Sequence, residues 1–161
     1  MKRNRALSEP PPRPFVVVTN NGAVRAAYGG VLAVEYVDGT PLDALGRASL
    51  LLRRRCRLLS APLPPNVPLM RAPFRSLLLE ETANGEGDPD GIYAIEKARE
   101  TMRAQRAISV RRGLADSAEA DFAALDADWL ARALREARLL PPEDALLRAR
   151  PSGFLLRLRE R

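Results

Sequence analysis

Residues 58–76 have the sequence LLSAPLPPNVPLMRAPFRS, and five of the thirteen residues from Ala61 to Pro73 are proline. Proline has a fixed φ and no backbone N–H, so this segment is neither a helix interior nor a central strand. We therefore expect a stiff loop with a buried strand on each side. A loop of this length inside a compact domain is more often functional than idle.

The segment predicted to lie beside this loop is the apolar run Phe15–Val18, which is followed by Thr19, Asn20 and Asn21. A continuous β-branched run is typical of a strand that is covered on both faces. Asparagine side chains cap helices, so the pattern indicates a turn and then a short helix over residues 23–28.

The rest of the chain alternates strand patterns with helical patterns. Further strands are predicted at 31–37, 57–60 and 74–81, and further helices begin near Pro41, Pro89 and Asp116. This alternation indicates a small three-layer α/β fold. We expect a mainly parallel sheet of about four strands, helices on both faces and a C-terminal helical segment.

Length and composition favour one α/β domain over residues 15–138. We expect a disordered, basic, proline-rich arm at 1–14 and a tail at 139–161 whose pattern allows one short helix. The sequence has no apolar run of membrane-spanning length and no signal-peptide pattern, which predicts a cytoplasmic protein without a membrane segment.

The residue types present restrict the possible chemistry. Histidine is absent and Cys56 is the only cysteine, which excludes disulfides within the chain, thiolate metal clusters and histidine-based catalysis. The helical spacing predicts that Cys56 is a small core residue. We predict no metal site and no cofactor, because only carboxylates, arginines, hydroxyls, Lys97 and backbone amides are left for chemistry.

The net charge of +6 lies mostly at the two ends of the chain. Residues 1–13 have a net charge of +3 and residues 139–161 of +2, whereas the part between them has only +1. A nearly neutral body disfavours nucleic-acid binding, and only the basic ends leave that possibility open.

The candidate ligand site lies where strands end. In α/β sheets, ligands bind beyond the carboxyl ends of the strands, and the turn after residue 18 and the proline-rich loop both leave strands at that edge. Amides, a hydroxyl and a guanidinium there suit a small anionic or polar ligand, although either asparagine could instead cap the helix. The candidate ligand-binding residues are Thr19, Asn20, Asn21, Arg71, Arg75 and Ser76.

An ordered series of short blocks resembles the GrdX family. The blocks are Thr19–Asn21, Val34–Tyr36 with Gly39–Thr40 and Leu42–Leu45, Leu58–Leu59 with Pro62–Leu63, Ala72–Ser76, and Asp121–Asp126 with Leu130. The resemblance extends over residues 15–136. The sequence departs from the family pattern at Ala61, where the family tends to have histidine, and at Phe74, where it tends to have tyrosine.

The resemblance implies a genetic context and no particular reaction. Members of the family are encoded beside components of the glycine, sarcosine and betaine reductases of amino-acid-fermenting bacteria. The resemblance therefore implies an accessory role, with a reductase component as a possible partner.

These observations give one leading hypothesis and two alternatives. The leading hypothesis is a non-catalytic accessory module that binds a small anionic or amino-acid-like ligand, or a reductase component. The first alternative is an enzyme for a phosphorylated or acyl metabolite, in which Arg75 and Asn20 stabilise charge and Ser76 or Asp38 reacts. The second is weak nucleic-acid binding through the basic ends.

Overall fold

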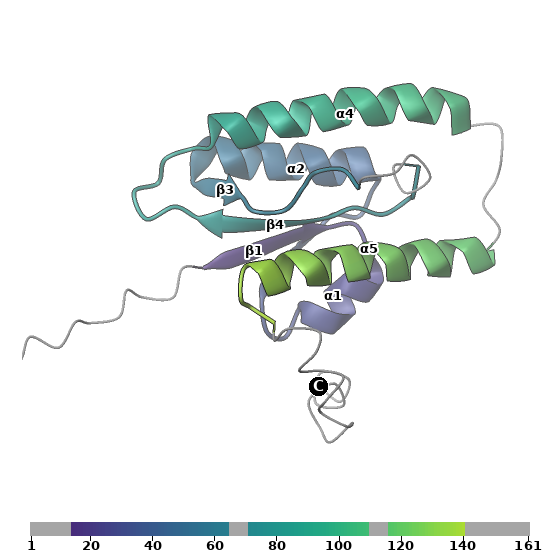
Figure 1. Ribbon diagram of the computed structural model, residues 1–161, viewed down its shortest axis with the longest axis horizontal. Coiled ribbons are helices and arrows are strands. Elements are labelled where there is room, and N and C mark those ends of the chain that lie inside the picture. Colours follow the sequence, from purple (N-terminus) through teal and green to yellow (C-terminus); the bar gives the residue numbers. More distant parts are fainter. Residues whose placement is uncertain (1–13, 65–70, 110–115, 141–161) are drawn as a thin grey trace, which may run out of the picture.

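The computed structural model describes residues 14–64, 71–109 and 116–140. The predicted arm at 1–14 and tail at 139–161 therefore lie almost wholly outside the described residues, as does the middle of the proline-rich loop. The elements, shown in Figure 1, are β1 (Phe15–Thr19), α1 (Gly22–Tyr28), β2 (Ala33–Tyr36), α2 (Pro41–Arg54), β3 (Cys56–Leu58), β4 (Ser76–Glu81), α4 (Pro89–Ser109) and α5 (Asp116–Glu136).

The strands of the described residues form one sheet in the order β2-β1-β4-β3. The α/β class is confirmed, but the prediction of a mainly parallel sheet is wrong. Only β1 and β2 are parallel, with Val17 opposite Val34, whereas β4 runs antiparallel to both β1 and β3.

The proline-rich loop explains the antiparallel pairings. Two parallel neighbours need a crossover that returns the chain across the sheet, usually as a helix. Here β4 starts at the same sheet edge at which β3 ends, because Cys56 at the start of β3 pairs with Glu81 at the end of β4 and the backbone N–H of Ser60, just after β3, donates to the carbonyl oxygen of Leu78. The carboxyl ends of β1, β2 and β3 and the start of β4 therefore share one edge of the sheet.

Helices cover both faces of the sheet, as predicted. α2 and α4 pack on one face and α1 and α5 on the other, which gives three layers (Figure 1). Val16 and Val18 face α2, whereas Val17 faces α1 and α5, in keeping with the two-residue period of a strand. Both β1 and β4 are therefore central strands with buried faces.

The predicted helix starts match the local hydrogen bonds. Thr40 and Asp43 form a reciprocal capping box at the start of α2, with Pro41 in the first turn. Asp88 caps α4 by accepting a hydrogen bond from the backbone N–H of Gly91 at 2.9 Å. Cys56 is fully buried in the core, as predicted, but it is the first residue of β3 and not part of the helix whose spacing led to that prediction.

Candidate functional site

Asn20 joins the turn after β1 to the end of the proline-rich loop. Its Nδ2 donates to the carbonyl oxygens of Gly39 at 3.0 Å and Pro73 at 2.8 Å, and its Oδ1 accepts from the backbone N–H of Arg75 at 2.7 Å. The prediction that these two segments lie side by side at one sheet edge is confirmed.

A chain of buried polar side chains continues from this junction into α5. The hydroxyls of Thr19 and Ser76 are 2.7 Å apart, and the Ser76 hydroxyl donates to Oδ2 of Asp126 at 2.6 Å. Asp126 also accepts from the backbone N–H of Ser76 at 2.9 Å and from Nδ2 of Asn21 at 3.0 Å. Since Ser76 uses its proton on Asp126, Thr19 donates to Ser76.

Asp126 is a site residue that the sequence reasoning missed. It is only 7% exposed, although α5 has several exposed acidic residues. The signal was its position four residues from both Phe122 and Leu130, which places a carboxylate on the buried face of the helix. A charged residue on a buried face is normally paired or hydrogen-bonded, as Asp126 is.

The two predicted arginines lie in different places. Arg75 is 3% exposed, and burial lowers the pKa of its guanidinium from the usual value, while the charge of nearby Asp126 opposes that shift. Arg71 is exposed and its Nη2 lies 3.4 Å from Oε1 of Gln105 on α4. The structure thus brings five of the six candidates together and places Arg71 on the α4 side of the sheet.

The polar atoms of the two asparagine side chains are already bound within the protein. Asn21 caps α1 by accepting from the backbone N–H of Ala23, and its Nδ2 donates to Asp126 and to the carbonyl oxygen of Ala123. Because both amide hydrogens of Asn20 are used as well, these side chains hold the site together. Direct ligand contact by any of the six candidates stays a prediction.

Next to this network lies an open cleft of about 450 Å³. It is bordered by the start of α1, by Tyr36 at the end of β2, by Phe74, and by Glu119 and Ala123 of α5. The guanidinium of Arg25 stacks on the Tyr36 ring, 4.9 Å from its centroid. A separate cavity behind Phe74 measures about 10 Å³, which is room for one water molecule.

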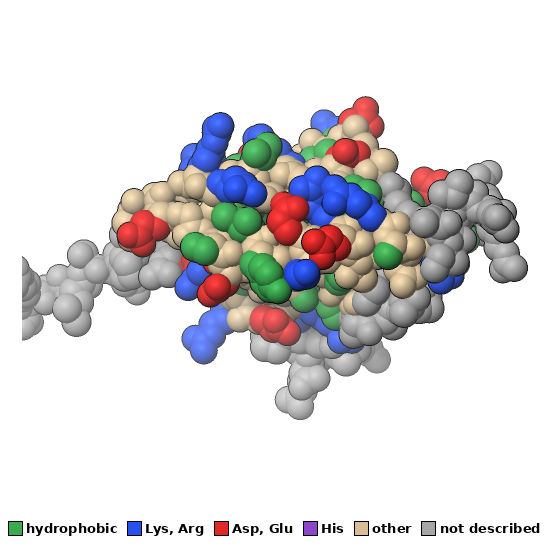
Figure 2. Space-filling model, turned by 90° about the horizontal axis from the view of Figure 1, so that it is seen from above, with side chains coloured by type: hydrophobic (Ala, Val, Ile, Leu, Met, Phe, Trp, Pro, Cys, Tyr) green, Lys and Arg blue, Asp and Glu red, His purple; other side chains and the backbone are tan. Residues whose placement is uncertain are grey.

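The face formed by α2 and α4, on the other side of the sheet from α1 and α5, has charged side chains of both signs (Figure 1 and Figure 2). Figure 2 shows basic and acidic side chains interspersed over α4 and α2, and Lys97 pairs there with Glu100 and Arg99 with Glu96. In the part of the chain that the structure describes, no group of three acidic or cysteine side chains is arranged to hold a metal ion. No helix within the same residues has the length and apolar content needed to span a membrane.

Comparison with known proteins places the chain in a family. Residues 16–135 match the family model described as GrdX-like protein. The chain belongs to the GrdX-like protein family. This confirms the resemblance seen in the sequence, and the GrdX match extends from β1 into α5 and includes the whole cleft. No curated protein and no solved structure matches the chain.

Proposed function

We propose that this GrdX-like protein is a non-catalytic binding module for a small amino-acid-like zwitterion, and that it serves as an accessory to glycine, sarcosine or betaine reductase. The ligand occupies the cleft beyond the carboxyl ends of β1 and β2, the position that ligands commonly take in α/β sheets. The reductase association is supported by family membership alone.

The observation on which the ligand class rests is a carboxylate and two aromatic rings in the lining of the cleft, with the guanidinium of Arg25 stacked on one of those rings. Glu119 provides a carboxylate on one wall, and Tyr36 and Phe74 provide aromatic rings. An ammonium group is attracted both by a carboxylate and by the face of a ring. Arg25 does not line the cleft, but its guanidinium stacks on Tyr36, which does, and in this proposal it turns to receive the ligand carboxylate.

Binding is favoured over catalysis because, of the two candidate reacting groups, Ser76 is enclosed and Asp38 does not border the cleft. Ser76 is 1% exposed, and its hydroxyl already donates to Asp126. A nucleophile needs a partner that accepts its proton and an open path to the substrate. The Ser76 side chain lacks that path, whereas the side chains of Tyr36 and Glu119 reach solvent.

The test is calorimetric titration with glycine, sarcosine and betaine, together with acetate and methylamine as half-ligands. We expect the zwitterions to bind at least tenfold more tightly than either half-ligand. Glu119→Gln and Arg25→Gln should each weaken binding about tenfold or more, a loss of about 1.4 kcal/mol. Glu100→Gln, an exposed change on the α4 face, should leave binding unchanged.

Two results would contradict the proposal in different ways. No heat with any zwitterion, or binding that both cleft variants leave unchanged, would remove the ligand. A pull-down that recovers no reductase subunit with or without glycine would remove the accessory role while leaving the ligand in place.

A further inference from the structure

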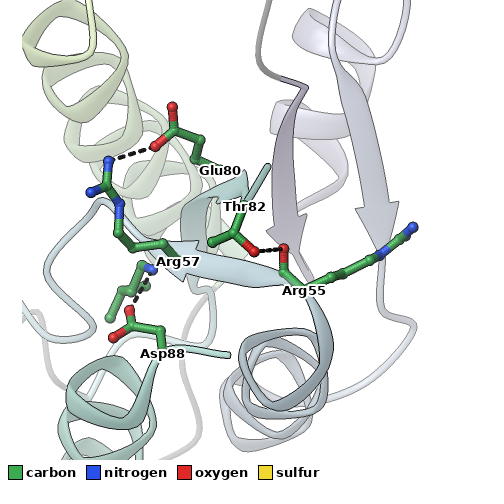
Figure 3. Close-up of polar contacts among 6 residues, drawn as sticks. Arg55, Arg57, Glu80, Thr82 and Asp88 are labelled. Atoms are coloured by element: carbon green, nitrogen blue, oxygen red, sulfur yellow. Dashed lines mark hydrogen bonds and ion pairs between the residues drawn. The ribbon is translucent and has the colours of Figure 1, made fainter. Parts of the chain in front are cut away.

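The two outer edges of the sheet differ in how they are covered. At the β3 edge, the backbone N–H of Leu58 points away from β4 and donates to Oδ2 of Asp88 at 2.9 Å (Figure 3). The backbone N–H of Asp88 in turn donates to the carbonyl oxygen of Leu52 at 2.9 Å. The segment before α4 therefore closes this edge against another strand.

Within the described residues, no segment pairs with the outer side of β2. The backbone N–H of Val37 donates to the carbonyl oxygen of Thr19 at 2.8 Å, so Val37, Glu35 and Ala33 direct their backbone groups towards β1. Successive residues alternate, and the N–H and C=O groups of Val34 and Tyr36 therefore point away from the sheet. Among the residues that the structure describes, no group forms a hydrogen bond with them.

The side chains along this edge are accessible. Ala33 and Tyr36 are exposed, and Val31 just before the strand is 61% exposed. Glu35 pairs with Arg47 of α2 on one face, and Tyr36 stacks with Arg25 of α1 on the other. Unpaired strand edges of this kind are templates for another strand.

We propose that β2 pairs with β2 of a second copy of this chain, antiparallel about a two-fold axis at Glu35. In that register Val34 of each copy lies opposite Tyr36 of the other, and every outward backbone group of these two residues gains a partner. The two sheets join into one continuous sheet across the axis.

Both faces of β2 are self-complementary in this arrangement, which is why we choose a second copy over an unrelated peptide. On the α1 face, the apolar Val34 and the aromatic Tyr36 form favourable cross-strand pairs. On the α2 face, the two Glu35 carboxylates meet at the axis. Each is already paired with an Arg47 whose side chain is 46% exposed, so the Arg47 guanidinium groups of both copies offset the repulsion.

Cysteine crosslinking tests the register directly. In a non-hydrogen-bonded antiparallel pair the two Cα atoms are about 4.5 Å apart, within the range that a disulfide spans. We expect Glu35→Cys to form a covalent dimer under mild oxidation. The matched control is Val31→Cys, because that position is more exposed than Glu35 but would lie about 26 Å from its counterpart. Native Cys56 is buried and should not crosslink.

The expected result is crosslinking of the Glu35→Cys variant at least tenfold faster than that of the Val31→Cys variant. Equal rates at the two positions, or no crosslink at either, would overturn the proposal. A sedimentation analysis would also overturn the proposal if the unmodified chain stayed monomeric from about 1 µM to 1 mM, the concentration range in which small interfaces associate.

Two further variants separate dimerisation from folding. Val34→Pro removes an outward N–H and no hydrogen bond of the ladder to β1, although it also alters the packing of the Val34 side chain, so the dimer should dissociate at least tenfold more readily while the chain still folds. Glu35→Lys gathers four positive charges at the axis and should have the same effect, whereas adding Arg47→Glu to it should restore association. Dimers that both single variants leave unchanged would show that association uses another surface.

Discussion

Asn20 and Asn21 are adjacent in the sequence, yet their side chains bind different parts of the fold. Asn21 caps α1 and reaches α5, whereas Asn20 holds the carbonyl oxygens of Gly39 and Pro73 and the N–H of Arg75. A cap is local to one helix. The hydrogen bonds of Asn20 instead hold two connecting segments against the end of β1.

Asn20→Ala should therefore cost more stability than the loss of a cap. The change removes three hydrogen bonds and leaves the buried backbone N–H of Arg75 without this acceptor, so we expect a loss of about 3 kcal/mol in urea unfolding. Asn84→Ala, in an exposed turn, is the control and should stay within about 0.5 kcal/mol. A loss below about 1 kcal/mol for Asn20→Ala would indicate that the three contacts contribute little.

Cys56 should make the stability depend on alkaline pH. Burial, and then the charge of Glu81, raise the pKa of its thiol, so the folded chain keeps the proton at a pH at which the unfolded chain loses it. The free energy of unfolding should then fall as pH rises above about 8.5, by at most about 1.4 kcal/mol per pH unit.

The matched variant for this effect is Cys56→Ala. Tyr28, whose pKa burial also raises, is present in both chains, so the difference between their urea unfolding profiles from pH 7 to 10.5 isolates the thiol. We expect the variant to have the flatter profile. Parallel profiles would contradict a raised pKa at Cys56.

At the level of elements, the sequence predicted where strands and helices lie along the chain better than it predicted whether neighbouring strands run parallel or antiparallel. Apolar runs at 15–18, 31–37 and 74–81 located three of the observed strands, and Thr40 and Asp88 marked helix starts. Strand direction was predicted from the alternation of strands and helices. That argument failed between β3 and β4, which follow one another without the crossover that parallel neighbours need.

The site was predictable only where the polar residues adjoin strands in the sequence. Thr19, Asn20, Asn21, Arg75 and Ser76 follow β1 or precede β4 closely, so the topology brings them together. Asp126 comes from a distant helix. Its contribution depends on how α5 is rotated about its own axis, which leaves Asp126 buried and the adjacent Leu125 45% exposed.

Two glycines, Gly87 before α4 and Gly46 inside α2, should respond to alanine substitution with stability changes of opposite sign. A Cβ on Gly87 would lie 2.7 Å from the carbonyl oxygen of Leu52, which is backbone of α2 and cannot turn aside. Gly87→Ala should therefore destabilise the fold by about 1 kcal/mol or more. Gly46 lies inside α2, and a Cβ there meets no heavy atom within 4 Å, so Gly46→Ala should stabilise the helix by about 0.5–1 kcal/mol.

Thermal and urea unfolding of the two alanine variants measures both signs in one experiment. If both variants were destabilised, α2 would be intolerant of any change. If neither were, the segment before α4 would be free to move away from α2.

At the level of the whole molecule, Asp126 connects α5 to the sheet. Asp126→Ala would leave the Ser76 N–H and hydroxyl and one Asn21 amide hydrogen without this acceptor. Because these groups are buried, we expect a loss of about 3 kcal/mol or more and faster amide exchange in α5 than in α4. Asp128→Ala, an exposed change on the same helix, is the control and should alter neither.

Hydrogen exchange followed by mass spectrometry makes this comparison directly. A uniform acceleration over α4 and α5 would mean that Asp126 supports global stability alone. A change confined to α5 would identify that helix as a separable unit of the fold.

The central position of β1 also affects how the chain folds during its synthesis. Val16 pairs with Ala33 of β2 on one side and with Leu79 of β4 on the other. Because β4 follows β2 by about forty residues in the sequence, β2 leaves the ribosome well before β4 does. While the residues between them are being added, the nascent chain has a strand with an open hydrogen-bonding side and apolar residues on both faces. Unpaired strand edges and exposed apolar residues of this kind favour aggregation until β4 has been added.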